Sequence, residues 1–250
     1  MKDRINQFLR RFGYEVRKGP ISVAGLKLEP DFFKKHQWLK KIGFKTIIDI
    51  GANQGQFASR VRILFPKAQI YSFEPIPEVF TLLTRRFEKD SHFKAFNLGL
   101  GNRSGSFDFF QNEFSDSSSL LPMKSLHKEN FPFSSSAKRI QIPVETLDTV
   151  TSHHLALMSP LLIKIDVQGF ETMVIQGGRE TLKKASHLLV EVSFQELYEN
   201  QQSFEATYSL LKEMGFSFMG TYEQLLSPKD GSVLQADAIF VNDAVRQAVD

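Results

Sequence analysis

The residues with the clearest chemical meaning lie between Asp49 and Gly55, in the segment DIGANQG after the apolar run KTIIDI. Glycines let a backbone turn sharply or approach a ligand, and the start of a following helix favours an anionic group. The segment does not match the dinucleotide-binding motif G-x-G-x-x-G, because Asn53 and Gln56 stand in place of its second and third glycines. It does not match a phosphate-binding P-loop either, because no Gly-Lys-Ser/Thr follows. We therefore expect a ligand that carries an amine and a carboxylate, with Asp49 facing the amine directly or through water. The alternative is a tight turn without a ligand. The candidate binding residues are Asp49, Gly51, Asn53 and Gly55.

Two further polar residues end the next two apolar runs. Glu74 follows QIYSF, and Asn97 follows FKAF. In a doubly wound sheet the carboxyl ends of the strands border the ligand, so Glu74 is placed to accept both hydroxyls of a ribose. Asn97 would border an adenine. The alternatives are a solvated strand-end carboxylate at Glu74 and a plain turn at Asn97.

A second cluster, KIDVQGFE, runs from Lys164 to Glu171 after another apolar run. Two carboxylates and an amide within six residues exceed what a structural turn needs. Asp166 is the candidate general base, or the group that orients an acceptor hydroxyl. Lys164 and Glu171 complete the candidate catalytic set, although a carboxylate at the start of a helix is explained as well by the helix dipole.

Glu191, near the end of the apolar run HLLVEV, offers a metal-binding alternative. Beside Asp166 it would give a divalent cation a second carboxylate. We favour a site without metal, because only two candidate oxygen ligands are visible. A histidine can act as a base near neutral pH, but His153 and His154 lie in an apparent loop, where such a pair is more often inert.

The elements that must position these residues alternate, from residue 45 onward, between short apolar runs and helical periodicity. This succession predicts an α/β fold, with about seven strands in a mostly parallel sheet and helices on both faces. The last two strands would close it as an antiparallel pair. The expected strands are 45–50, 69–73, 93–98, 105–110, 139–145, 161–167, 187–194, 216–221 and 236–241, and the expected helices are 54–65, 78–89, 170–185 with a break at Gly177-Gly178, and 204–214.

Several motifs together resemble the FkbM family of S-adenosylmethionine-dependent methyltransferases. They are TIIDIGANQGQF, YSFEP, NLGLGNRSG, SSSLL, VETLDT, LLIKIDVQGFE and EVSFQELYENQQSF, and they span about Lys45 to Gly220. The resemblance implies a Rossmann-like class I methyltransferase fold. It also implies methyl transfer from S-adenosylmethionine, with S-adenosylhomocysteine as product, to a hydroxyl of a sugar, glycan or natural product. The implied cofactor-binding residues are Asp49, Gly51, Asn53, Gly55, Phe57, Glu74, Pro75 and Asn97.

The N-terminal segment differs from the rest of the chain. Residues 1–45 hold 12 Lys/Arg and 4 Asp/Glu, whereas the net charge of all 250 residues is only +3. We expect an appendage over 1–44, partly helical through Ile5, Phe8, Leu9 and Phe12, and a methyltransferase domain over 45–250. Its helix either packs on the body or contacts an anionic membrane surface or polyanionic substrate. Trp38 would pack this segment onto the sheet.

Composition narrows the remaining choices. The chain has no cysteine, which excludes disulfides and thiolate metal sites, and no apolar run long enough to span a bilayer. We expect a cytoplasmic protein that binds no nucleic acid. Acceptor specificity would lie in the loop 112–138. Transfer to nitrogen or to a protein, and a binding module without turnover, are the alternative functions.

Overall fold

The computed structural model describes residues 21–23, 26–28, 36–112, 118–124, 126–127 and 137–246. They belong to two units, one ending at Ile42 and one beginning at Gly43. The first contains the antiparallel strands β1 (Ile21–Val23) and β2 (Leu26–Leu28) and the helix α3 (Gln37–Ile42). The expected helix at Ile5–Phe12 lies outside the described residues. The packing of Trp38 on the sheet, and the boundary at residue 44, stay predictions.

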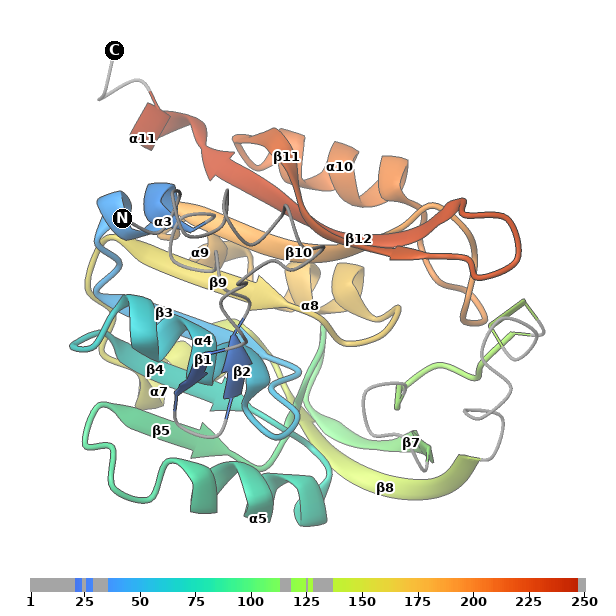
Figure 1. Cartoon of the computed structure of the whole chain (residues 1–250). Helices are drawn as coiled ribbons and strands as arrows, with labels where there is room; N and C mark the ends of the chain where they lie inside the picture. The colour runs from blue at the N-terminus through green and yellow to red at the C-terminus, as the bar shows by residue number, and fades with distance from the viewer. Residues whose placement is uncertain are drawn as a thin grey trace, which may run out of the picture. The chain divides into compact units, whose positions relative to one another are not determined.

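A seven-stranded sheet forms the centre of the second unit (Figure 1). Its spatial order is β11-β12-β10-β9-β3-β4-β5. Neighbours from β10 to β5 pair in parallel, and β12 runs antiparallel to both of its neighbours. This arrangement confirms the expected class I methyltransferase fold. The strands are β3 (Thr46–Ile50), β4 (Gln69–Phe73), β5 (Phe93–Phe96), β9 (Leu161–Ile165), β10 (His187–Ser193), β11 (Phe216–Leu226) and β12 (Val233–Asn242).

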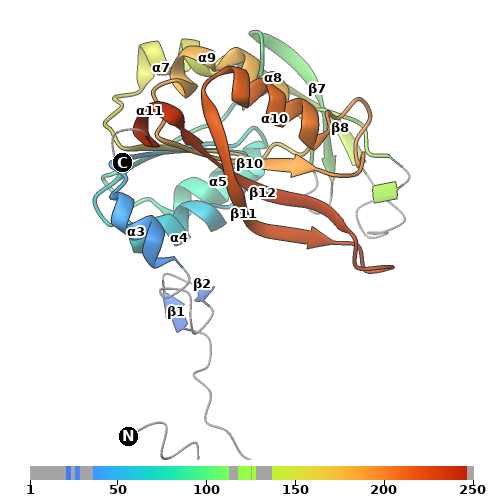
Figure 2. The ribbon, with the colours of Figure 1, turned by 90° about the horizontal axis from the view of Figure 1, so that it is seen from above.

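Helices cover both faces of this sheet, as Figure 2 shows. On one face lie α4 (Gln56–Leu64) and α5 (Pro77–Arg86), and on the other lie α7 (Leu147–His154), α8 (Glu171–Gly177), α9 (Arg179–Leu182) and α10 (Phe204–Glu213). A last short helix is α11 (Asp243–Arg246). Apolar side chains at helical spacing, such as Ala58, Val61 and Leu64 of α4, are buried. The expected break at Gly177-Gly178 separates α8 from α9. No helix in the described ranges is both long and apolar enough to cross a membrane.

A separate three-stranded sheet consists of β6 (Gly99–Leu100), β8 (Ala137–Glu145) and β7 (Gly105–Asn112), in that spatial order. The sequence predicted strands at 105–110 and 139–145 but not that they leave the main sheet. Phe109 and Ile142 form a small core with Ile76 and Val79 at the start of α5. The apolar side of this sheet therefore packs beside the end of β4.

The expected loop position of His153 and His154 is wrong. Both lie in the last turn of α7. At the start of this helix, the Thr146 hydroxyl accepts a hydrogen bond from the Thr149 N–H. This side-chain cap stabilises a helix where the polar sequence suggested a loop. Both histidines are exposed, and neither lines the pocket described below.

Two glycines allow a matched test of close packing in this fold. Gly51 (φ +79°) and Gly215 (φ +85°) both have left-handed backbones. A Cβ added at Gly51 would lie 1.8 Å from the Asp166 carbonyl oxygen, whereas a Cβ added at Gly215 would have no atom within 4 Å. We expect Gly215→Ala to cost about 1–2 kcal/mol from backbone strain alone. Gly51→Ala should cost about 4 kcal/mol or more, because the β3 and β9 ends must separate. Urea unfolding measures both, and equal losses would refute the close approach.

Candidate active site

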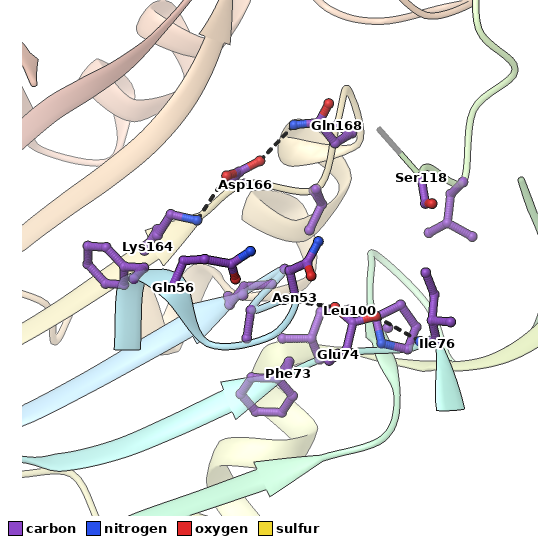
Figure 3. A pocket seen from close by; sticks show the side chains of 18 of the residues that line it. Asn53, Gln56, Phe73, Glu74, Ile76, Leu100, Ser118, Lys164, Asp166 and Gln168 are labelled. Atoms are coloured by element: carbon purple, nitrogen blue, oxygen red, sulfur yellow. Dashed lines mark hydrogen bonds and ion pairs between the residues drawn. The ribbon is translucent and has the colours of Figure 1, made fainter. Parts of the chain in front are cut away.

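A pocket of about 320 Å³ opens at the carboxyl ends of β3, β4 and β9. Its wall continues over the start of α4, the small sheet and the hairpin of β11 and β12. This is the size range of small-molecule sites, and the edge of the sheet is where α/β folds bind ligands. Figure 3 shows side chains from the ends of β3, β4 and β9, from α4 and from the small sheet turned toward one space.

The loop between β3 and α4 supplies one side of the pocket. Gly51 and Asn53 of this loop line the pocket, as does Phe57 in the first turn of α4. Asn53 adopts a left-handed backbone (φ +47°), and its side-chain oxygen accepts the Gln54 N–H at 2.7 Å. Gly55 does not line the pocket. A Cβ there would lie 2.6 Å from the Phe87 ring, so the structure explains this glycine by packing toward α5.

Glu74 lies where the sequence predicted, at the end of β4, and lines the pocket together with Pro75. It is buried, and its two carboxylate oxygens accept the N–H groups of Asn53 and Ile76, each at 2.9 Å. These backbone donors fix the orientation of the carboxylate (Figure 3). An oriented carboxylate at this position suits the hydroxyls of a ribose.

Asn97 has a different position from the one expected. Its amide donates hydrogen bonds to the carbonyl oxygens of Glu74 (2.9 Å) and Pro75 (3.0 Å), and it does not line the pocket. The following residues Leu98 and Leu100 do. Asn97 therefore ties the end of β4 to the end of β5, while apolar neighbours form the surface that would face a flat ring.

Asp49 is fully buried and does not line the pocket. Neither carboxylate oxygen has a hydrogen-bond partner, and the nearest cation is the Lys164 ammonium at 3.9 Å. Burial raises the pKa of Asp49 to about 6, although Lys164 opposes the shift. The cationic partner expected for Asp49 is thus present within the protein, and a contact with a cofactor amine stays a prediction.

Lys164 and Asp166 line the pocket where β9 ends, on the wall that we call its floor. The Lys164 ammonium lies 2.9 Å from one Asp166 oxygen, and the Gln168 amide donates to the other oxygen at 2.9 Å. Burial alone would lower the pKa of Lys164, but the carboxylates of Asp166 and Asp49 outweigh it and hold that pKa above its ordinary value. Lys164 is therefore a fixed cation, and both oxygens of Asp166 already accept a donor.

The Gln168 amide also separates Asp166 from Glu191. Its nitrogen donates to both carboxylates, at 3.0–3.1 Å for Glu191, while the Tyr198 hydroxyl donates to its oxygen at 2.8 Å and fixes its orientation. An N–H donor that points at both carboxylates lies where a bridging cation would have to be. This donor set does not fit the Asp166–Glu191 metal alternative, and among the described residues no group of three or more His, Cys, Asp or Glu side chains is placed to hold a metal ion.

Glu171 faces the backbone instead of the pocket. One carboxylate oxygen accepts the N–H groups of Val167 and Gly169, both at 3.0 Å. These bonds shape a turn in which Gln168 and Gly169 have positive φ angles of 55° and 98°. Burial raises the pKa of Glu171 to about 7. Its geometry is that of a residue which positions Gln168, and it is not among the lining residues.

Sequence reasoning named Phe57 of α4 but missed Gln56 and Arg60 of that helix and the lining residues of the last two strands. Asp237 of β12 lies opposite Glu191 of β10, and Tyr222, Glu223 and Arg60 complete this end of the pocket. Burial raises the pKa of Asp237 to about 6, with Asp166 adding to the shift. One sequence feature could have revealed it, since Asp237 is the one charged residue in the apolar strand VLQADAIFVN.

The burial of the Asp49 carboxylate predicts a stability that depends on pH. The pKa of about 6 in the folded chain exceeds the ordinary value of 3.8, so stability falls as pH rises from about 4 to about 6. Asp49→Asn removes this cost. We expect its unfolding free energy to match wild type at pH 4 and to exceed it by up to about 3 kcal/mol at pH 8. Asp230→Asn in an exposed turn should show no such gain. A less stable Asp49→Asn at pH 8 would mean that the attraction to Lys164 outweighs burial.

Comparison with known proteins agrees with this geometry. Residues 49–218 match the methyltransferase FkbM domain. The 2-O-methyltransferase NoeI of Sinorhizobium fredii is 32% identical over 217 residues, covering 83% of this chain and 84% of that protein. Methyltransferase 1 of Beauveria bassiana is 27% identical, covering 76% and 82%. The hexuronic acid methyltransferase AglP of Haloferax volcanii is 27% identical, covering 58% and 54%. With the family match over most of its length, this chain belongs to the FkbM family of S-adenosylmethionine-dependent methyltransferases.

Proposed function

We propose that this methyltransferase methylates a hydroxyl oxygen of a sugar or of a sugar-containing molecule. The main support is its similarity, over more than four-fifths of both chains, to a protein named for 2-O-methylation. A more distant relative is named for methylation of a hexuronic acid. Carboxylates at the Asp166 end of the pocket suit an acceptor that donates hydrogen bonds through hydroxyl groups.

The residues at the other end of the pocket fit S-adenosylmethionine. Glu74 would accept hydrogen bonds from its ribose, and the start of α4, at Gln56 and Phe57, would face its carboxylate. Leu98 and Leu100 would border its adenine. When bound there, the cofactor supplies a methyl group on an electrophilic sulfonium.

The fixed charges of the floor would orient the acceptor. Asp166 is held by Lys164 and Gln168, so its carboxylate has a defined direction. A group so constrained can align a hydroxyl without rearrangement, and alignment is a large part of catalysis by proximity. Glu171 contributes indirectly, because it shapes the turn that carries Gln168.

The charges at this end also favour a neutral acceptor. Asp166, Glu223 and Asp237 line it, against the cations Lys164 and Arg60. Arg60 is already paired with Glu223 at 3.3 Å, and Lys164 with Asp166. An anionic acceptor would meet no unpaired cation among the described residues of this lining and would approach the carboxylate of Asp237. A neutral or amino sugar avoids this repulsion.

The role of Glu74 is tested with S-adenosylhomocysteine. Glu74→Gln keeps the size of the side chain but removes its charge, so hydrogen bonds from the ribose weaken. Affinity should fall roughly tenfold or more, which corresponds to the 1.5–3 kcal/mol typical of charged hydrogen bonds. Calorimetry measures it, with Glu78→Gln on the exposed side of α5 as the control. Unchanged affinity in Glu74→Gln would remove Glu74 from the cofactor site.

The acceptor is tested with methyl glycosides of neutral hexoses, deoxyhexoses, amino sugars and uronic acids. We expect formation of S-adenosylhomocysteine and an O-methyl sugar, with kcat/KM about tenfold or more higher for the best neutral or amino sugar than for any uronate. Mass spectrometry locates the methyl group. Methylation of nitrogen alone, or cofactor binding without transfer to any glycoside, would contradict the proposal.

A further inference from the structure

Three carboxylates lie in a row across neighbouring strands at the acceptor end of the pocket. In the parallel pair Val190 is opposite Ile165, which places the next residues, Glu191 and Asp166, at one level. In the antiparallel pair Glu191 is opposite Asp237. Residues at the same level of adjacent strands point to the same face of a sheet. Asp166, Glu191 and Asp237 therefore share one face.

Their hydrogen bonds divide the three carboxylates into two kinds. Asp166 accepts from Lys164 and Gln168, one donor for each oxygen. Glu191 accepts from Gln168 and from the Gln235 amide at 2.8 Å. Asp237 also lines the pocket and is partly buried, but no residue that the structure describes donates a hydrogen bond to its side chain. A partly buried carboxylate that lines a pocket and has no donor among the described residues is open to a donor from a ligand.

The surroundings of Asp237 favour proton transfer. Lys164 faces it from β9, Asp166 from the turn after β9, Glu191 from β10, Tyr222 and Glu223 from β11, and Arg60 from α4. Burial and the Asp166 charge raise its pKa to about 6, while Lys164 and Arg60 limit the shift. The Asp237 carboxylate is thus ionised at neutral pH yet more basic than that of an exposed aspartate. A general base needs both properties, because it must be deprotonated at the working pH and must still accept a proton readily.

We propose that Asp237 is the general base that accepts the proton of the acceptor hydroxyl, and that Asp166 orients this hydroxyl. The inference rests on the proposed methylation of a hydroxyl. The O–H proton passes to an Asp237 oxygen, and an oxygen lone pair forms the new bond to the methyl carbon. The electrons of the breaking C–S bond stay on sulfur. The carboxylate becomes a neutral acid and the sulfonium a neutral thioether, so charge and atoms balance.

The kinetic test compares isosteric variants of the two aspartates. Asp237→Asn should lower kcat by about 100-fold or more and should leave affinity for S-adenosylhomocysteine within about twofold. Wild-type kcat should rise with pH to a plateau above about pH 7, and Asp237→Asn should lose this rise. Asp166→Asn should lower kcat/KM, but its kcat should still rise with pH. Asp230→Asn, in the exposed turn of the same hairpin, is the control for activity, and thermal unfolding confirms that every variant is folded.

A second measurement judges Asp237 without any acceptor. In protein labelled with carbon-13 at the aspartate carboxyl groups, the NMR signal that disappears in Asp237→Asn should titrate near pH 6. If wild type methylates no glycoside, the proposed function fails, but the titration still tests whether Asp237 has the pKa expected of the general base. A titration near pH 4, or more than a tenth of wild-type kcat in Asp237→Asn, would overturn the assignment.

Discussion

The burial of the Lys164 ammonium is the constraint on which the pocket depends. Removing a cation from water costs several kcal/mol, and the cost is met only if opposite charges lie close by. Here Asp49 of the neighbouring strand and Asp166 of the following turn provide them, at 3.9 and 2.9 Å. The ring of Phe57 lies 5.4 Å from the same cation. Residues of strand β3, strand β9 and helix α4 thus all interact with the Lys164 ammonium. These contacts hold the pocket floor in one arrangement, at the place where we propose that the acceptor hydroxyl is aligned.

This arrangement gives similar side chains different properties. Asp49 is fully buried, Asp166 is held by two donors, Glu191 is bridged to Asp166 by an amide, and Asp237 has no protein donor among the described residues. Environments that separate the pKa values of neighbouring acids are how one site assigns different roles to one type of group. At the other end, Glu74 is oriented by backbone N–H groups. One end of the pocket therefore suits a fixed cofactor, and the other suits proton transfer.

The sequence predicted well what depends on local pattern. Each apolar run became a strand, and Glu74, Lys164 and Asp166 lie at or beside the pocket because parallel strands bring their carboxyl ends to one edge. Roles that depend on distant packing were not predictable. Gly55 is explained by its contact with the Phe87 ring, and Asn97 by hydrogen bonds to another strand end. Neither contact can be inferred from the spacing of residues along the chain.

Asp237 was missed for a reason of topology. A residue in the middle of a parallel strand lies away from the edge where ligands bind, but β12 runs the other way and extends past the end of β9, so its fifth residue lies level with Asp166. Beside it, the register of β11 shifts between Thr221 and Gln224, and the intervening Tyr222 and Glu223 line the pocket. Bulges of this kind redirect side chains next to active sites. The closing hairpin therefore brings Tyr222, Glu223 and Asp237 to the end of the pocket where we propose that the acceptor binds.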